Sequence, residues 1–169
     1  MKKHQSMKEH SSMRNPYQRK SSTHGIAEIE LVYRCQGPKR SRRKITCAQD
    51  AYLVLRPFWP KDTICLYEQF RILLLDRANY VLGVALLSSG GIAGSVMDPK
   101  LVFVTALKAK ASSLILAHNH PSGNNKPSRI DFTITRQLKE AGTLLELPIL
   151  DHLILTTDGY YSMADQGVL

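Results

Sequence analysis

The chain has few cysteines, and their spacing excludes two common kinds of small stabilised domain. There are three cysteines, an odd number, and no two of them form a CxxC pair: they are Cys35, Cys47 and Cys65. The sequence therefore indicates neither a disulfide framework nor a thiolate metal site. We expect reduced, mostly structural thiols and a cytoplasmic location. With 169 residues, of which 43% are hydrophobic, the chain is long enough to fold around one core without cross-links.

Long hydrophobic runs are also absent. No apolar stretch approaches the roughly 18 residues that a membrane-spanning helix needs; runs such as RILLLD at 71–76 have the length of a strand. The basic N-terminus is not followed by the apolar segment of a secretory signal peptide. The sequence therefore predicts a protein that has no membrane partner.

Negative charge is scarce in the first 44 residues. This segment has twelve Lys/Arg and three Asp/Glu, a net charge of +9, whereas residues 45–169 have eleven of each and are neutral. It has no hydrophobic period and ends in the cluster PKRSRRK at 38–44. We predict a basic arm, 1–44, that is largely disordered apart from a strand near 27–34. Nucleic acid is a candidate partner of the arm, and a solubilising tail is the alternative.

Residues 45–169 mix strand patterns with helix patterns and are predicted to form one domain. Strand patterns cover 67–76, 80–89, 113–117, 148–157 and 160–163, and helix patterns cover 45–59, 100–111 and 129–141. A short turn at 77–79 predicts a hairpin between the first two strands. Hairpin and crossover connections together predict an α/β fold with a mixed central sheet flanked by helices.

The ends of the helices are predicted from residues that cap free backbone groups. Ser, Thr and Asp accept hydrogen bonds from the first N–H groups of a helix, and Gly permits the backbone turn that ends one. The predicted caps are Thr46 with Gln49 for the first helix, Asp98 with Pro99 for the second, and Ser128 with Gly142 for the third.

Two of the six histidines lie two residues apart at the end of a buried run. His118 and His120 follow SLILA at 113–117, and the strand period of two places both side chains on one face. Asp131 lies in the first turn of the next helix, and the loop between can bring it beside the histidines. Two imidazoles and a carboxylate are sufficient to hold a catalytic Zn²⁺, with a fourth position left for water.

Each of these residues has a simpler interpretation when taken alone. Ser128 and Asp131 fit a capping box, and the histidines fit polar residues at a strand end. Their combination favours the metal site. A hydrolytic site also needs a carboxylate that accepts a proton from water; Glu68, at the start of the strand 67–76, is the candidate, and an exposed glutamate without a role is the alternative.

The same segments resemble a known family. An upstream Glu followed by HxHx7SxxD is the metal motif of the JAMM-type JAB/MPN proteins, and EQFRILLLD, AHNHPSGNNKPSRIDFTIT and ILDHLIL resemble their RadC branch. The resemblance covers about residues 46–169. It implies a cytidine-deaminase-like α/β fold, with Glu68 as general base, Ser128 as an oxyanion donor, and one Zn²⁺ per chain held by His118, His120 and Asp131.

Two further features bear on this resemblance. Many proteins of the RadC branch carry a helix-hairpin-helix DNA-binding region ahead of this domain, and we expect none in 1–44 because that segment has no helical pattern. Asp151 and His152 match the family's LDH. They either contact the metal ligands from behind or are an ordinary strand histidine and its neighbouring aspartate.

Two functions from different classes follow from the sequence. We predict a zinc hydrolase that cleaves peptide or isopeptide bonds in a protein substrate, with the link to DNA repair that the branch's name suggests. The alternative is a DNA-associated accessory protein with a structural or vestigial metal. HNH nucleases spread their motif over a ββα unit, whereas HNH is contiguous at 118–120, and nucleobase deaminases need a PCxxC pair that is absent here.

Overall fold

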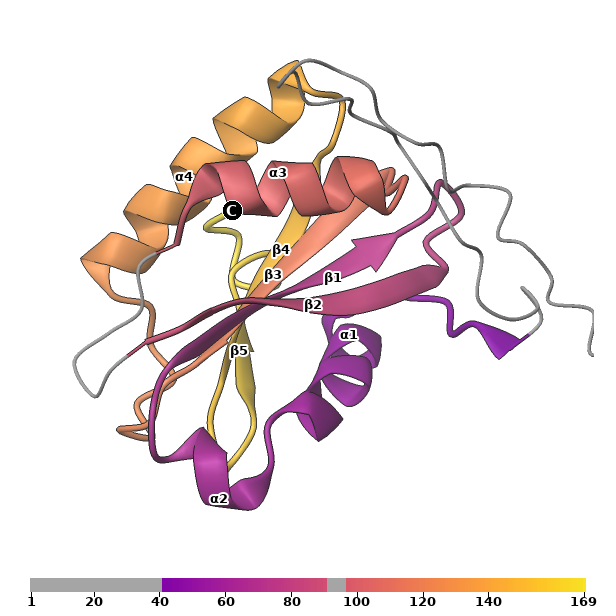
Figure 1. The fold of residues 1–169 in the computed structure, drawn as a ribbon. Coiled ribbons are helices and arrows are strands. Elements are labelled where there is room, and N and C mark those ends of the chain that lie inside the picture. Colours follow the sequence, from indigo (N-terminus) through magenta and orange to yellow (C-terminus); the bar gives the residue numbers. More distant parts are fainter. Residues whose placement is uncertain (1–40, 91–96) are drawn as a thin grey trace, which may run out of the picture. The chain divides into compact units, whose positions relative to one another are not determined.

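In the part of the chain that the structure describes, five strands form a mixed sheet in the order β2-β1-β3-β4-β5 (Figure 1). The structure is a computed structural model and describes residues 41–90 and 97–169; the strand predicted near 27–34 lies outside this part. The strands are β1 (Gln69–Leu75), β2 (Val81–Ser89), β3 (Ser113–Asn119), β4 (Ile149–Leu155) and β5 (Tyr160–Ser162). The helices are α1 (Ala48–Leu55), the 3₁₀ helix η2 (Arg56–Phe58), α2 (Lys61–Ile64), α3 (Pro99–Lys108) and α4 (Arg129–Leu144). The predicted α/β fold with a mixed sheet is confirmed.

The pairing of the strands places the end of β3 beside the start of α4. β1 pairs antiparallel with β2, as the predicted hairpin requires, and also with β3. β3 and β4 are parallel neighbours, and α4 is the crossover helix between them. Because a crossover begins where its first strand ends, side chains from the last residues of β3 and the first turn of α4 meet at the C-terminal end of β3.

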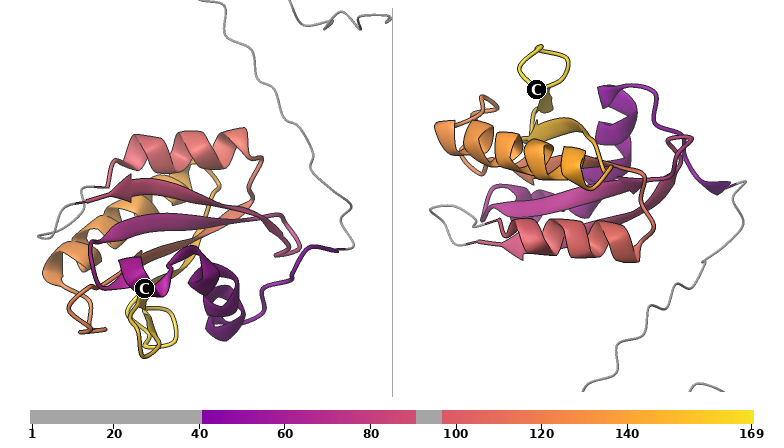
Figure 2. Two further views of the ribbon diagram at one scale, coloured as in Figure 1. Left: turned by 60° about the horizontal axis from the view of Figure 1, so that its bottom comes forward. Right: turned by 90° about the horizontal axis from the view of Figure 1, so that it is seen from above.

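Helices cover both faces of the sheet, with α3 and α4 on one side and α1 and α2 on the other (Figures 1 and 2). Alternate side chains of β3 separate accordingly: Leu114 and Leu116 pack toward α3 and α4, and Ile115 and Ala117 toward α1. β3 is buried along its whole length, as predicted for a strand covered on both faces. Burying a Leu or Ile side chain contributes about 1.5–3 kcal/mol, so β3 is a firm platform for the residues at its end.

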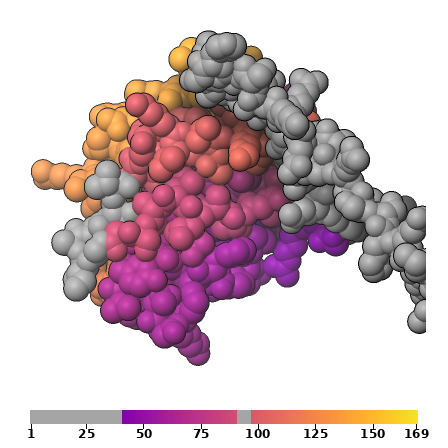
Figure 3. All heavy atoms as spheres, in the orientation of Figure 1, coloured from indigo at the N-terminus to yellow at the C-terminus, as the bar shows by residue number. Residues whose placement is uncertain are grey.

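In the view of Figure 3, α3 and β2 form the middle of the surface. α3 begins as predicted, with Asp98 as N-cap accepting a hydrogen bond from Lys100 N at 2.9 Å. Three apolar side chains on its outer side are exposed, namely Leu101, Val104 and Leu107. Among the helices of residues 41–90 and 97–169, none has both the length and the apolar character needed to cross a membrane.

The predicted start of the first helix is wrong. α1 begins at Ala48 after Cys47, and Thr46 does not cap it. Instead, the N–H and hydroxyl of Thr46 both donate to Asp50 Oδ2, at 2.9 and 2.6 Å. The preceding residue is held against the turn of the β1–β2 hairpin by a 2.9 Å bond from Ile45 N to Asn79 O, and the backbone of Cys47 is still extended.

The predicted end of the third helix is also wrong. α4 runs through Gly142 to Leu144, and Glu146 takes the left-handed conformation with φ 55°. The Leu147 N–H then bonds to Gly142 O at 2.8 Å and Glu146 N to Thr143 O at 3.2 Å, the pattern of a Schellman motif. Gly142 serves a different purpose, because a Cβ there would lie 2.5 Å from Leu147 O.

The thiols differ in part from expectation. Cys47 and Cys65 are free, as predicted, but both are exposed and so are not packed in the core. Cys35 lies outside the described residues.

Candidate metal centre

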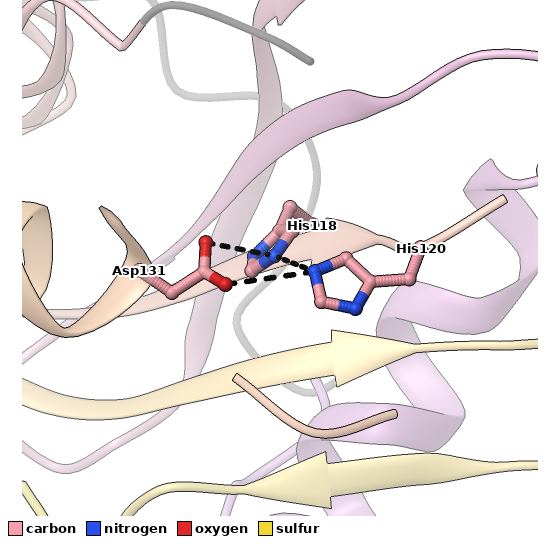
Figure 4. Close-up of side chains that lie close together, drawn as sticks. All are labelled: His118, His120 and Asp131. Atoms are coloured by element: carbon pink, nitrogen blue, oxygen red, sulfur yellow. Dashed lines mark hydrogen bonds and ion pairs between the residues drawn. The ribbon is translucent and has the colours of Figure 1, made fainter. Parts of the chain in front are cut away.

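The end of β3 and the first turn of α4 bring three potential ligands together. His118 Nε2 lies 2.9 Å from His120 Nε2 and 3.2 Å from Asp131 Oδ1, and His120 Nε2 lies 3.6 Å from Asp131 Oδ2. All three ligand atoms fall within 4.8 Å of one another. Figure 4 shows the carboxylate of Asp131 pointing from its helix toward both imidazoles. The structure thus assembles the trio that the sequence singled out.

The donor set fits a divalent cation that prefers nitrogen and oxygen. His120 Nδ1 lies 2.6 Å from the carbonyl oxygen of Asn124, and a carbonyl only accepts, so Nδ1 carries the proton and Nε2 presents a lone pair. A neutral imidazole and a carboxylate are ordinary ligands of Zn²⁺. Three protein ligands of this kind leave a coordination position for water or substrate, as catalytic zinc sites require.

Asp131 is both a cap and a candidate ligand. Its Oδ2 accepts from Ser128 N at 2.6 Å, and its own N–H donates to Ser128 Oγ at 3.2 Å, which completes a capping box. The capping interpretation and the metal interpretation are therefore compatible, because the box orients the carboxylate toward the histidines. Ser128 Oγ acts as an acceptor in this box and keeps its own proton for donation.

The charges of the trio support one another. Burial alone would raise the pKa of Asp131, but its close contacts with the imidazoles of His118 and His120 and the hydrogen bond from Ser128 N hold this pKa far below the ordinary value. Burial disfavours the charged form of His120, yet the Asp131 carboxylate and the Asn124 carbonyl raise its pKa above 6.5. The site therefore keeps a carboxylate ionised and attracts positive charge.

Glu68 is not a member of the trio, but the strand register and its charge relate it to His120. It precedes β1 by one residue instead of opening the strand, and it is half-buried. Phe70 pairs with His118 in the antiparallel register, so continuing the register sets Glu68 level with His120 and on the face of His118. The Glu68 carboxylate also contributes to raising the pKa of His120. This placement suits a proton acceptor next to a metal.

Comparison with known proteins supplies the family. Residues 45–168 match the family described as "RadC-like JAB domain". The chain belongs to this family. Similar curated proteins are the UPF0758 proteins of Flavobacterium johnsoniae (44% identical, over 85% of this chain and 62% of the relative), Salinibacter ruber (40%, 79% and 56%) and Porphyromonas gingivalis (38%, 85% and 63%). The chain thus spans about three fifths of the length of these relatives.

In this RadC-like domain, the residue between the two histidines faces the opposite side of the sheet. Asn119 is fully buried. Its Oδ1 accepts from Trp59 Nε1 and Gln69 N, both at 2.8 Å, and its Nδ2 donates to Ile64 O at 2.7 Å and Tyr67 O at 2.9 Å. Because Tyr67 and Gln69 are the two neighbours of Glu68, this amide fixes the backbone that carries the candidate base.

Asp151 and His152 behave differently from each other. His152 Nε2 lies 2.8 Å from His118 Nδ1, behind the candidate ligand. Burial and the neighbouring His118 hold the pKa of His152 well below its ordinary value, so its ring is neutral. Asp151 instead accepts from Ser162 Oγ at 2.6 Å and Ala164 N at 3.0 Å. The contact from behind is therefore made by the histidine, while the aspartate ties β4 to the end of β5 and to the segment that follows it.

Three residues near the site escaped the sequence reasoning. Thr135 Oγ1 lies 2.6 Å from His152 Nδ1, Asn124 supplies the carbonyl for His120, and the ring of Phe70 stacks on His118 with centroids 5.8 Å apart. Only Thr135 had a local signal, because it lies one helical turn after Asp131 on the same face.

Proposed function

We propose that this RadC-like JAB domain is a zinc-dependent hydrolase of the JAMM type that cleaves peptide or isopeptide bonds. The observation that carries the proposal is the convergence of His118, His120 and Asp131 at the C-terminal end of β3, with ligand atoms within 4.8 Å of one another. Glu68 beside them adds the group that hydrolysis needs and a purely structural metal site does not.

The residues divide the chemistry among them. His118, His120 and Asp131 would hold the ion, which when bound would supply Lewis acidity toward a scissile carbonyl and toward water. Glu68 would accept a proton from the attacking water and return it to the leaving amine. The Ser128 hydroxyl, at the N-terminus of α4, would donate to the oxygen on which negative charge develops, and the helix dipole has the sign to assist.

The substrate and the partners are proposed from the family resemblance and from the charge of the chain. A protein substrate follows from the peptide or isopeptide chemistry of the JAMM motif, and a link to DNA repair from the RadC resemblance alone. Nucleic-acid binding by residues 1–44 rests on their net charge of +9. The alternative, an accessory protein with a structural metal, is disfavoured by the half-buried Glu68, whose charge acts on His120.

Metal content and hydrolysis test the proposal together. We expect about one zinc per chain in the wild type and substantial loss in His118→Ala and His120→Ala, with His10→Ala from the arm as a matched control. The zinc-loaded protein is then offered peptide, isopeptide-linked and DNA substrates. Full zinc occupancy in both site variants would refute the ligand assignment. Hydrolysis of none of the substrates, combined with a zinc-dependent interaction with DNA, would favour the accessory protein.

A further inference from the structure

A continuous chain of hydrogen bonds runs behind the candidate ligand His118. His118 Nδ1 lies 2.8 Å from His152 Nε2, His152 Nδ1 lies 2.6 Å from Thr135 Oγ1, and Thr135 Oγ1 lies 2.5 Å from the backbone oxygen of Asp131. The chain joins β3, β4 and α4 and returns to the residue that supplies the third ligand. His118, His152 and Thr135 are all buried, so each contact is made in a region of low dielectric.

The direction of these bonds is set at the end that lies on α4. The Asp131 carbonyl can only accept, so the Thr135 hydroxyl must donate to it. The same hydroxyl oxygen then accepts from His152 Nδ1–H, which leaves His152 Nε2 without a proton. That nitrogen accepts from His118 Nδ1–H, and His118 Nε2 consequently presents a lone pair to His120 and Asp131.

The opposite direction would disable the metal centre. If Thr135 donated to His152 Nδ1, two oxygen atoms would face each other at 2.5 Å with no hydrogen between them. His152 Nε2–H would then donate to His118 Nδ1, and His118 Nε2 would carry a proton toward the ligand position. A protonated nitrogen cannot bind a metal. The hydrogen bond from the Thr135 hydroxyl to Asp131 O therefore decides whether His118 Nε2 can bind a metal.

We propose that Thr135 and His152 are positioning residues that fix His118 in the Nδ1–H tautomer, so that Nε2 is ready for a metal before one arrives. The inference deepens the proposed function and rests on its ligand assignment. Neither residue touches the metal position; both act through His118. An orientation set in this way is costly to disturb, because a buried polar group that loses its partner is left unsatisfied.

Thr135→Val is the decisive variant, because it removes the hydroxyl with little change of shape. Without an acceptor at Nδ1, His152 should move its proton to Nε2 and donate to His118, which then takes the Nε2–H tautomer. Thr135→Ser keeps the hydroxyl and should behave as the wild type. Thr143→Val is the matched control, since Thr143 also donates to the carbonyl four residues earlier, Lys139 O at 2.9 Å, but is exposed.

Two measurements on the full chain read out the proposal. Long-range ¹H–¹⁵N spectra of the metal-free protein should show His118 protonated at Nδ1 in the wild type, Thr135→Ser and Thr143→Val, and at Nε2 in Thr135→Val. Zinc affinity by competition with a chelator should fall about 10- to 100-fold in Thr135→Val alone, the usual effect of losing a partner behind a ligand.

The outcomes separate this inference from the proposed function. An Nε2–H tautomer of His118 in the metal-free wild type would overturn the inference, as would a folded Thr135→Val protein with unchanged tautomer and unchanged zinc affinity. A third outcome is that all four proteins show the expected tautomers but the wild type takes up no zinc. That outcome would support the hydrogen-bond chain and overturn the metal centre.

Discussion

The two proposed functions, hydrolase and accessory protein, differ most in what they predict for Glu68. Glu68→Gln keeps the shape of the side chain but cannot accept a proton, so we expect a folded protein that retains its zinc and loses about 10²- to 10⁴-fold in turnover. Asp131→Asn should lower zinc content along with turnover, because it changes a ligand. The exposed Glu140→Gln on α4 is the control for charge alone. Wild-type turnover of Glu68→Gln would remove Glu68 from the mechanism.

Asn119 should matter for stability as much as any apolar core residue. Asn119→Ala leaves two donors and two acceptors without their partner. Since an unsatisfied buried group costs about 1–3 kcal/mol, we expect a loss of about 3 kcal/mol or more in the free energy of unfolding. Urea denaturation measures it, with the exposed Asn125→Ala as control. A loss below about 1 kcal/mol would show that water replaces the amide.

His120 gives the metal-free protein a distinct pH dependence. Its folded pKa is raised above 6.5, mainly by Asp131 against the opposing effect of burial. The stability that the bound proton contributes is therefore complete below about pH 6.5 and is lost as the pH rises through the folded pKa. Asp131→Asn should lower this pKa, and zinc should reverse the trend because it competes with the proton. NMR titration checks this; a metal-free pKa at or below 6.5 would contradict it.

The ligand trio could be predicted because its geometry is local. His118 and His120 share a face through the strand period, and Asp131 is placed by the helix that begins directly after their loop. The contacts of His152 and Thr135 could not be predicted in the same way. They depend on how closely β4 and α4 approach β3, which follows from packing between segments far apart in the sequence.

At the scale of single elements, the C-terminal end of α4 offers a test of backbone strain. Glu146 is exposed and has φ 55°, a conformation that costs an L-residue free energy and that glycine adopts freely. Glu146→Gly should therefore raise the free energy of unfolding by about 0.5–1 kcal/mol, after the extra freedom of glycine in the unfolded chain is counted. Thermal or urea unfolding measures the change.

The matched substitution at Gly142 should have the opposite sign. Alanine in a helix is normally more stable than glycine by about 1 kcal/mol, but a Cβ at Gly142 would meet Leu147 O at 2.5 Å. Gly142→Ala is therefore expected to destabilise the protein. A stabilising Gly142→Ala together with a destabilising Glu146→Gly would mean that α4 ends at Gly142, as the sequence had suggested.

The elements themselves were largely readable from hydrophobic patterns, and the errors lie at their ends. The hairpin β1–β2, the buried strand β3 and the N-caps of α3 and α4 agree with expectation. The first helix begins later than predicted because Ile45 bonds to Asn79, and α4 continues because Gly142 is needed for close approach and not for a turn. Both causes are contacts with a neighbouring segment, which a local pattern does not contain.

At the scale of the whole molecule, charge is distributed unevenly along the chain. Residues 1–44 carry the net charge of +9, and residues 45–169 are neutral. The last residues of the basic segment belong structurally to the domain: Arg43 O accepts from Val81 N at 2.9 Å, and Lys44 bridges to Tyr80. A truncated protein that tests the arm should therefore begin at Ser41, so that this pairing with β2 is kept.

Binding of the full chain to double-stranded DNA should depend steeply on salt. Each phosphate neutralised by Lys or Arg releases counterions, so six contacts would lower the affinity about 10³-fold between 50 and 200 mM salt. The protein that begins at Ser41 lacks nine of the twelve basic residues of 1–44 and should bind far more weakly, with a shallower salt dependence and unchanged unfolding. Equal affinity of the two proteins at low salt would show that the arm makes no phosphate contacts and serves as a solubilising tail.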